Sequence, residues 1–401
     1  HYQNFTPPFD IPESWQWVRL GDYVINRDGE RVPIASTIRS KQSNKIYDYY
    51  GAAGAIDKVD NYIFDERLLL IGEDGANLLS RTKDNAFFAD GKYWVNNHAH
   101  VLDSSDKFLL EFVALYINTI PLDDYITGSA QPKLSQDNLN NIHLPIPPIE
   151  EQRRILTMIE SLMSIICEIR ESKQQLSQSI ALTKSKILDL AMQGKLVPQD
   201  PADEPAAEML RRVNPKAKII TDNPHYPQLP DNWVLTTIDS VCDYGYSENV
   251  NVDEIALSEW ILELEDIEKD SGCVVAQRSK KDRTVNGVRH RFVKGDVLYS
   301  KLRTYLNKVL VAPTDGYCTT EIIPVKSYDC VIPEYLCAWL RSPFFLSYTA
   351  ECCYGVKMPR LSTTDARKGI IPIPPINEQK RITQKLSKIS ELLSNLSISI
   401  D

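Results

Sequence analysis

The sequence predicts an α/β (α+β) protein with two tandem domains and two long helices that pair as an antiparallel coiled coil. Three observations lead to this prediction: an internal repeat, a heptad pattern of apolar residues in each half, and a polar connector between the halves. The chain has 401 residues, of which 43% are hydrophobic and 25% are charged. This composition is normal for globular proteins, and the length suits two or three domains.

Two motifs, which occur in the same order in each half, define the repeat. The first is (Ile/Leu)-Pro-x-x-Trp, at residues 11–15 and 229–233, with an offset of 218. The second is (Leu/Ile)-Pro-Ile-Pro-Pro-Ile-x-Glu-Gln-(Arg/Lys)-Arg, at residues 144–154 and 371–381, with an offset of 227. Because two motifs recur in order, chance is not a reasonable explanation.

The segments between the motifs, residues 16–127 and 234–354, differ strongly. Each half therefore has a repeated frame around a divergent insert. This arrangement is typical of a protein that performs one task twice, on two different targets. A duplicated scaffold that drifted without selection is the alternative interpretation.

Each Pro-rich motif is followed by a long helical pattern. Proline lacks a backbone N–H and cannot continue a regular helix, so both helices must begin after the prolines. Apolar residues then recur at alternating steps of four and three, which is the pattern of a coiled-coil seam. The seam residues are Ile155, Ile159, Leu162, Ile166, Ile169, Leu176 and Ile180 in the first helix, and Ile382, Leu386, Ile389, Leu393 and Leu396 in the second.

A long helix with a narrow apolar stripe must bury that stripe against another surface. The second seam lies 227 residues after the first and in the same phase. We therefore expect the helices to pair antiparallel, with one domain at each end and an approximate two-fold rotation between the domains. Two independent surface helices are the alternative.

The repeat and the helical patterns divide the chain into five parts. They are a first domain, a helix, an extended connector, a second domain and a second helix, at residues 1–146, 147–195, 196–227, 228–373 and 374–401.

The composition argues against several classes of protein. A net charge of −9 is unlike that of a protein that coats nucleic acid unaided. No apolar run approaches the ~18 residues of a membrane span, and no signal peptide is recognisable, so we expect a cytoplasmic protein. The eight cysteines include no Cys-x-x-Cys pair. We therefore expect reduced, buried thiols and no zinc site.

The two motifs, together with the segment Met192-Gln-Gly-Lys-Leu-Val-Pro198, resemble the specificity subunit of type I restriction-modification systems. The resemblance covers nearly the whole chain. Insert segments at residues 72–77, 94–98 and 296–303 also look like target-recognition segments of that family.

The resemblance implies a DNA sequence-specificity subunit with no catalytic site of its own. Each domain would be a target-recognition domain that reads one half of a split target in double-stranded DNA. The paired helices would act as a spacer and dock two methyltransferase subunits, which would carry S-adenosylmethionine, and restriction/translocase subunits could join them. The resemblance implies no cofactor, metal or membrane partner for this chain.

Other functions are less well supported. An adenine methyltransferase would need an Asn/Asp-Pro-Pro-Tyr/Phe loop and a Gly-rich cofactor loop, and neither motif occurs in the sequence. A non-DNA coiled-coil scaffold with two protein-binding modules is the main alternative, and its partner binding would lack the steep salt dependence of DNA binding. A pair of DNA-reading domains from a fused restriction enzyme is a further alternative.

Side-chain type and local charge select the DNA-binding candidates, because cations bind phosphates whereas amides and arginine read base edges. In the first domain the candidates are Arg39, Lys41, Asn77, Lys92, Asn97, His98, Gln131 and Lys133. In the second domain they are Lys280, Lys281, Arg283, Lys301, Arg303, Tyr305, Lys357 and Arg360.

The second insert is polarised in charge along the sequence. Residues 278–308 carry a net charge of +8, and the preceding residues 248–270 carry −8. This predicts a basic face, with a solvated charge run as the alternative. Lys301, Arg303 and Tyr305 alternate and would share one face of an extended strand. Arg303 is the expected guanine contact and Lys301 an expected phosphate contact.

Two further pairs of residues stand out by position. Lys133 and Arg360 end matched loops just before the two helices, so we expect both to contact phosphates. His98 and His100 have the spacing of a metal-ligand pair, but no carboxylate or cysteine partner is evident in the sequence. No metal site is therefore expected.

Overall fold

The computed structural model describes residues 6–128, 131–221, 228–355 and 357–398. The chain forms two compact units, with unit 1 ending at Ile169 and unit 2 beginning at Arg170. The division falls inside the longest helix, α6 (Ile149–Met192). Each unit has its own sheets and its own apolar core.

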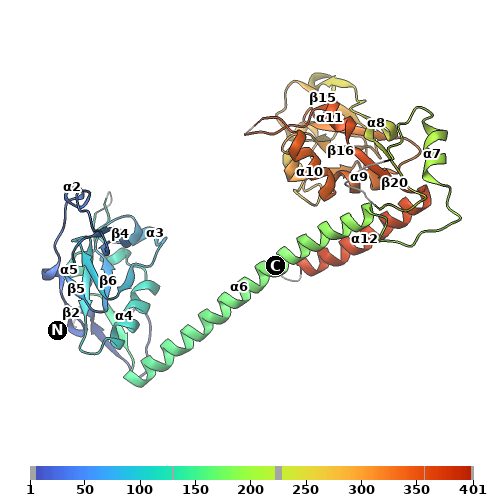
Figure 1. Cartoon of the computed structure of the whole chain (residues 1–401). Coiled ribbons are helices and arrows are strands. Elements are labelled where there is room, and N and C mark those ends of the chain that lie inside the picture. The colour runs from blue at the N-terminus through green and yellow to red at the C-terminus, as the bar shows by residue number, and fades with distance from the viewer. Residues whose placement is uncertain (1–5, 129–130, 222–227, 356, 399–401) are drawn as a thin grey trace. The chain divides into compact units, whose positions relative to one another are not determined.

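Unit 1 is built on three small sheets (Figure 1). A two-stranded sheet pairs β1 (Gln16–Arg19) with β10 (His143–Ile146). The central antiparallel sheet has the order β2-β9-β6-β7, with bounds Ile25–Asn26, Ala99–Asp103, Leu68–Gly72 and Ala86–Ala89. The outer sheet has the order β4-β3-β8-β5, with bounds Gly54–Val59, Tyr47–Gly51, Lys92–Val95 and Phe64–Asp65. The helices before α6 are α1 (Leu20–Tyr23), α2 (Ser36–Arg39), α3 (Asn77–Ser80), α4 (Phe108–Thr119) and α5 (Gln136–Asn140), and the 3-10 turns are η1 (Asp28–Glu30) and η2 (Asp123–Tyr125).

Strand β6 lies inside the central sheet of unit 1 and is buried on both faces. Leu69 and Ile71 pack into the cluster that contains the apolar residues of α4. Leu68 and Leu70 pack into the cluster formed with the outer sheet. Successive side chains of a strand point to opposite faces, so a strand between two packed layers needs the continuous apolar run Leu-Leu-Leu-Ile.

Unit 2 repeats this plan. Its two-stranded sheet pairs β11 (Val234–Thr237) with β20 (Ile370–Ile373). The central sheet has the order β12-β19-β16-β17, with bounds Cys242–Tyr244, Ile322–Ser327, Val297–Ser300 and Val309–Val311. The outer sheet has the order β13-β15-β18-β14, with bounds Asn249–Asn251, Val288–Phe292, Gly316–Thr319 and Ile261–Leu262.

The helices of unit 2 pack against the central sheet and against the end of α6. They are α7 (Ala206–Val213), α8 (Ile238–Val241), α9 (Pro333–Leu340), α10 (Pro343–Cys352), α11 (Thr363–Lys368) and α12 (Ile376–Ile398), and the 3-10 turns are η3 (Val252–Glu254), η4 (Leu264–Asp266), η5 (Lys280–Asp282) and η6 (Thr304–Leu306). In β16, Val297 and Tyr299 face the helices, whereas Leu298 faces the outer sheet. The central strand of unit 2 is therefore buried by the same alternation as β6.

Inside each unit, the strand that directly follows the first motif pairs with the strand that contains the start of the second motif, and we call the resulting two-stranded sheet the frame. Gln16 lies opposite Ile146 in unit 1, and Val234 lies opposite Ile373 in unit 2. These partners are related by the offsets of 218 and 227. The two frames thus have the same register, although the second insert is longer.

A buried glutamine at the start of each long helix ties the helix to its frame. Nε2 of Gln152 donates to the carbonyl of Pro147, and Nε2 of Gln379 donates to the carbonyl of Pro374, both at 2.9 Å. Proline carbonyls cannot be satisfied by a continuing helix here, so the side-chain amide supplies the missing donor. This explains why both halves have glutamine at this position.

The outer sheets show where the two inserts diverge. The strand β3 runs parallel to β8, as β14 does to β18. The strand β5 runs antiparallel to β8, as β15 does to β18. The fourth strand joins opposite edges, with β4 beside β3 in unit 1 and β13 beside β15 in unit 2. The fourth strand of each outer sheet is thus added at an edge of that sheet, where it does not disturb the central sheet.

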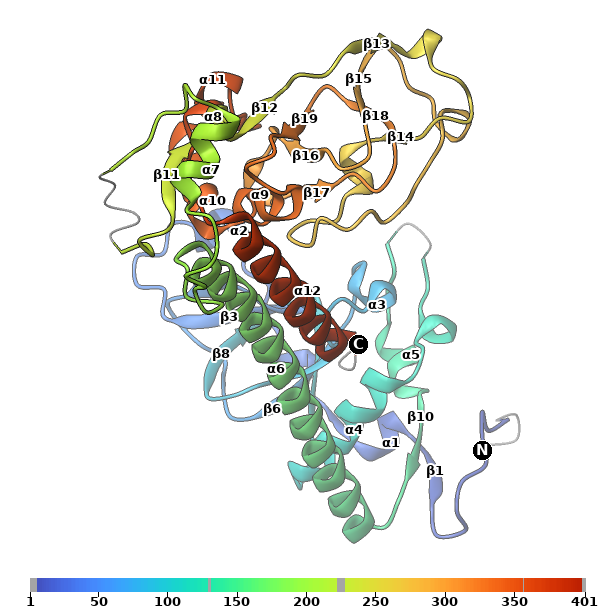
Figure 2. The same ribbon diagram turned by 90° about the vertical axis from the view of Figure 1, so that its right-hand side faces the viewer.

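The helices α6 and α12 lie side by side and run antiparallel in unit 2 (Figure 1 and Figure 2). Ile382, near the start of α12, is buried in one cluster with Ala191 and Met192 at the end of α6. Ile180 of the predicted seam is also buried. The prediction of an antiparallel helix pair is confirmed.

The predicted seam is buried over only part of its length. Leu162, Ile166, Ile169 and Leu176 of α6 are exposed, and so is Leu396 of α12. For the four residues of α6 the reason is length, because α6 has 44 residues and the described part of α12 has 23. These five residues are therefore not buried within this chain.

The first helix covers residues 149–192, and it begins after the prolines and ends before the glycine, as the sequence predicts. The connector is not wholly extended, because α7 buries Ala206, Met209 and Leu210 in the core of unit 2. Residues 222–227 of the connector and 399–401 of the second helix lie outside the described residues. Within the described part of the chain, no helix is long and apolar enough to cross a membrane.

Replacing Gln379 with alanine is expected to lower the free energy of unfolding of unit 2 by about 1–3 kcal/mol, because buried groups lose their hydrogen-bond partner. The amide of Gln379 accepts from the N–H of Ile332 and donates to the carbonyls of Cys330 and Pro374. Denaturant unfolding measures the change. Gln174→Ala, on the exposed face of α6, is the matched control and should change the free energy by less than about 0.5 kcal/mol. Equal effects of the two variants would contradict the role of Gln379.

The cysteines should differ in reactivity. Cys167 and Cys273 are exposed, so the expectation of uniformly buried thiols is wrong for these two. Burial raises the pKa of Cys330 and of Cys337 to about 11, and a thiol reacts as its thiolate. Alkylation of the native protein at neutral pH, followed by mass spectrometry, should label the exposed pair and spare the buried pair. Equal labelling of all four would show that unit 2 opens readily.

Candidate nucleic-acid interface

Two loops of unit 1 are joined beside the end of β6. The first follows β6 directly, from Glu73, and the second ends at Lys133. Asp74 and Lys133 form an antiparallel bridge, and the N–H of Gly75 donates to the carbonyl of Pro132 at 3.0 Å. The N–H of Leu134 donates to the carbonyl of Glu73 at 2.8 Å. Residues 129–130 of the second loop lie outside the described residues.

Unit 2 has the same loop pair, built from corresponding backbone contacts. Leu302 and Arg360 form the antiparallel bridge. The N–H of Arg303 donates to the carbonyl of Pro359 at 2.7 Å, and the N–H of Leu361 donates to the carbonyl of Lys301 at 3.0 Å. We call each of these structures the loop pair of its unit. The matched contacts place Arg303 at the position that Gly75 occupies in unit 1.

This position requires a left-handed backbone in both units. Gly75 has φ 107° and Arg303 has φ 51°. An arginine pays a cost of roughly 1–2 kcal/mol in this conformation that glycine avoids. The Arg303 side chain is exposed, and within the described residues it makes no hydrogen bond or ion pair. A strained backbone that presents an unpaired cation is typical of a functional position.

The predicted alternation of Lys301, Arg303 and Tyr305 along one strand face is wrong. The strand β16 ends at Ser300, Arg303 is left-handed, and residues 304–306 form the turn η6. The sequence pattern could not show this, because a left-handed residue in place of glycine has no periodic signature. Arg303 and Tyr305 are nevertheless both exposed on the same loop.

Other exposed side chains surround the loop pair of unit 2. Tyr354 and Met358 are exposed large apolar residues on the second loop, and sequence reasoning missed both. Lys357 is exposed between them in sequence, and residue 356 lies outside the described residues. Cations beside exposed aromatic rings suit a nucleic-acid surface, because they bind phosphates and pack against sugars and bases.

The cations that end the two loop pairs are both held by acids. In unit 1, Nζ of Lys133 lies 3.2 Å from the carboxylate of Glu73. In unit 2, Arg360 donates to both carboxylate oxygens of Glu321, at 2.8 and 3.2 Å. Because both cations remain partly exposed, either could exchange its acid for a phosphate.

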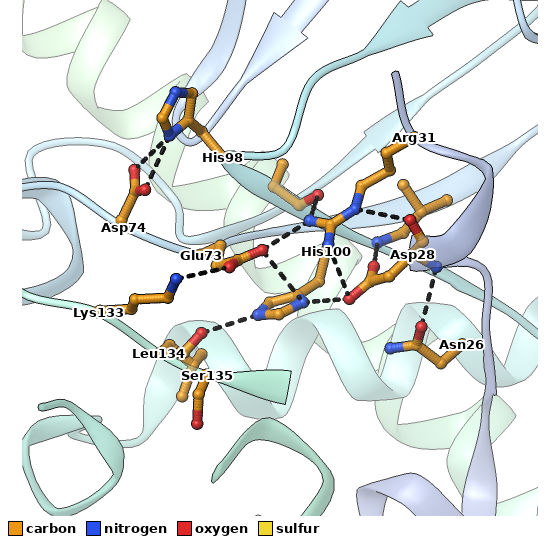
Figure 3. A network of polar contacts seen from close by, with 12 residues as sticks. Asn26, Asp28, Arg31, Glu73, Asp74, His98, His100, Lys133, Leu134 and Ser135 are labelled. Carbon is orange, nitrogen blue, oxygen red and sulfur yellow. Dashed lines mark hydrogen bonds and ion pairs between the residues drawn. The ribbon is translucent and has the colours of Figure 1, made fainter. Parts of the chain in front are cut away.

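Behind the loop pair of unit 1 lies a buried polar cluster, which we call the His100 network and define as Asp28, Arg31, Glu73 and His100 (Figure 3). Nδ1 of His100 lies 2.6 Å from the Asp28 carboxylate. Arg31 donates to Glu73 at 2.7 Å and lies 3.4 Å from Asp28. Four side chains from three segments of the chain therefore meet at the base of the loops.

The His100 network does not fit a metal ion, although Asp28, Glu73 and His100 each place a ligand atom within 4.8 Å of the others. Both carboxylates already pair with the guanidinium of Arg31. Nε2 of His100 contacts the carbonyl of Leu134 at 2.8 Å and so carries a proton instead of a free lone pair. His98, two residues before His100, is not part of the network and lies 2.8 Å from the carboxylate of Asp74.

Four of the predicted DNA contacts are built into the fold instead. Arg39 pairs with Asp57 at 2.9 Å and lies over a tyrosine ring. Asn77 hydrogen-bonds to Lys83 and Asn85, which fixes the α3 turn. Lys280 donates to two backbone carbonyls, both at 2.7 Å. The fourth of these residues is Arg283, whose side chain is buried and forms an ion pair with Asp266.

The predicted basic face of the second insert is neutralised in part, because the acidic run folds back onto the basic run. Arg283 pairs with Asp266, and Arg289 pairs with Glu263 at 3.0 Å. Nζ of Lys308 donates to a backbone carbonyl of η4. Charges that are segregated along the sequence are thus partly paired in space, whereas Arg291, Lys294 and Arg303 stay exposed.

The remaining candidates lie at the surface. Lys92 lies over the ring of Tyr62 and near Asp65. Lys301 is partly buried. The others are exposed, and within the described residues their side chains form no hydrogen bond or ion pair: Lys41, Asn97, Gln131, Lys281 and Lys357.

Comparison with known proteins identifies the family. The profile described as the type I restriction modification DNA specificity domain matches residues 12–178 and 284–400. The specificity subunit of the Escherichia coli type I restriction enzyme EcoDI is 21% identical, over 94% of this chain and 82% of that protein. The MjaVIII specificity subunit of Methanocaldococcus jannaschii is 21% identical, over 96% of this chain and 88% of that protein.

Two solved structures share the fold. The HsdS subunit from Thermoanaerobacter tengcongensis is 18% identical, with a TM-score of 0.54, over 98% of this chain and 93% of that chain. A chain from a structure of the assembly and conformational transition of the type I R-M system is also 18% identical, with a TM-score of 0.57, over 98% and 94%. The repeated frames, the antiparallel helices and the matching profile together lead to one conclusion: the chain belongs to the family of type I restriction-modification DNA specificity domains.

Proposed function

We propose that this chain is the specificity subunit of a type I system and that each unit reads one half of a bipartite target in double-stranded DNA through its loop pair. The observation that carries the proposal is the loop pair itself. Its backbone contacts are the same in both units, but the side chains at matched positions differ, as with Gly75 and Arg303. A common scaffold with different side chains is what two different half-sites require.

The side chains of each loop pair suggest how reading would differ. Unit 2 presents the unpaired guanidinium of Arg303, and arginine suits the two acceptors of guanine in the major groove. Unit 1 presents no side chain at the corresponding Gly75 and offers the amide of Asn97 on the neighbouring turn. Amides suit adenine edges. The two units would therefore read their half-sites with different chemical groups.

The same proposal assigns the chemistry to partner subunits. Methyltransferase subunits that carry S-adenosylmethionine would dock on α6 and α12, and restriction/translocase subunits could join the complex. The likeness to a chain from a structure of type I complex assembly supports this assignment. The contribution of this chain would be to bind and orient the DNA. A protein-binding scaffold remains the competing function, and salt dependence of DNA binding separates the two.

An exchange of inserts tests independent reading. Residues 20–142 lie between the two strands of the first frame and can be replaced with the corresponding segment of the EcoDI relative. Because the frame register is kept, only one half of the methylated sequence should change. The measurement is the mapping of methylated adenines in cells that contain the chimera and its methyltransferase subunit. Replacement of residues 238–369 should change the other half, and a change in both halves from either exchange would disprove independent reading.

Arg303 variants test the proposed guanine contact. Arg303→Gly should relieve the left-handed strain and raise the free energy of unfolding by about 1 kcal/mol. It should also weaken DNA binding by about 1–3 kcal/mol, with the loss confined to one base pair. Binding of the assembled methyltransferase to single-base variants of the target measures this. Arg303→Lys is the matched control, since lysine keeps the charge but not the bidentate geometry. Full binding by Arg303→Lys would reassign Arg303 to a phosphate.

A further inference from the structure

The imidazole of His100 is completely buried, with 0% of its side chain exposed. Its two nitrogens both face acceptors (Figure 3). Nε2 lies 2.8 Å from the carbonyl oxygen of Leu134, and a carbonyl oxygen only accepts. Nδ1 lies 2.6 Å from the carboxylate of Asp28. If Asp28 is ionised, both nitrogens must donate and the ring is a buried imidazolium.

The surroundings of Asp28 keep its carboxylate ionised. Burial alone would raise the pKa of Asp28, but the hydrogen bond and charge of His100, the N–H of Val101 and the charge of Arg31 together lower it. The N–H of Val101 donates to the second carboxylate oxygen at 2.7 Å. Both oxygens of Asp28 therefore accept, and each nitrogen of His100 faces an acceptor.

The charges of the His100 network balance without Lys133. The carboxylates of Asp28 and Glu73 are matched by the guanidinium of Arg31 and the imidazolium of His100, whose Nδ1 lies 3.8 Å from Glu73. Lys133 is a further cation on the outside, with its side chain 53% exposed against 12% for Glu73. A buried carboxylate that lost its only cation would be costly, but Glu73 keeps two cations when Lys133 leaves.

We propose that His100 is a positioning residue that leaves Lys133 available to bind a DNA phosphate. This inference rests on the proposed function and names a regulator of the first loop pair. The imidazolium neutralises the network from the inside, so Glu73 does not need Lys133 for its charge balance, and the Lys133 side of the ion pair is open to solvent. A neutral side chain at this position would leave Glu73 more dependent on Lys133. The cation would then be held back from the phosphate.

Unit 2 lacks this arrangement and provides a natural comparison. The strand pairing places Ile323 opposite Tyr299, where unit 1 has His100 opposite Ile71, and Ile323 is buried. The terminal cation of that loop pair, Arg360, holds Glu321 by two hydrogen bonds. Within the described residues Glu321 has no second cation within ion-pair distance. Release of Arg360 would thus leave Glu321 unpaired.

The first test measures DNA affinity of the assembled methyltransferase at several salt concentrations. His100→Gln should weaken binding by about 3- to 10-fold and lower the salt slope by about one, as expected for the loss of one phosphate contact. Lys133→Gln should do the same, and the double variant should bind no worse than Lys133→Gln alone. Arg360→Gln is the matched control. The loss of affinity in the double variant Arg360→Gln/His100→Gln should equal the product of the two single losses. Independent effects of His100→Gln and Lys133→Gln would overturn the proposal.

The second test is a rescue that a merely structural role of His100 would not give. Glu73→Gln removes the charge that would retain Lys133, so adding it to His100→Gln should restore affinity to within about twofold. Further weakening by Glu73→Gln would show that His100 acts only through folding, and would overturn the proposal.

A third measurement does not depend on the folding of any His100 variant. Lys133→Gln alone should weaken DNA binding by about 3- to 10-fold, because one phosphate contact is lost. An unchanged affinity of Lys133→Gln would overturn the proposal. If Lys133→Gln changes nothing but insert exchange still alters one half-site, the role of His100 fails and the reading function stands. If insert exchange also changes nothing, the proposed function itself fails.

Discussion

The pairing of each (Ile/Leu)-Pro-x-x-Trp strand with its Pro-rich strand is the constraint on which the rest of the structure depends. It brings the two ends of an insert of more than a hundred residues to one place, at Leu20 and Ile142 in unit 1. It also fixes where the long helix begins, because Gln152 bonds the proline carbonyl at that point. Sheets, loop pairs and helices are then positioned relative to a short, repeated base, and the insert can vary without altering that base.

The parts of the fold that follow local rules could be predicted from the sequence. Proline positions and heptad spacing predicted both long helices, and α6 begins directly after Pro148. The repeat predicted two similar units, because equal motifs in the same order must serve equal backbone roles. The extent of the seam could not be predicted, since it depends on how far α12 reaches along α6. Leu162 has the right phase for a seam residue and yet is exposed.

The candidate interface was harder to predict, because its residues meet through pairings between distant segments. His100 meets Asp28 across 72 positions of sequence, and Arg283 meets Asp266 across the boundary between a basic and an acidic run. Charge counts along the chain do not tell whether two runs fold onto each other. Arg283 and Arg303 looked alike in sequence, and only the fold shows that Arg283 is buried and Arg303 is exposed. The correspondence of Gly75 and Arg303 follows only from the matched backbone contacts of the two loop pairs.

The frame has a consequence for the order in which the protein folds. Its two strands are separated by a whole insert, so pairing them has a large entropic cost of loop closure until the insert is compact. Contacts between distant residues form slowly for the same reason. Each insert must therefore collapse on its own sheets first, the frame then closes, and only then does the long helix acquire a fixed starting point. On the ribosome, the first unit can complete this sequence while the second is still being synthesised, because none of its frame strands comes from beyond β10.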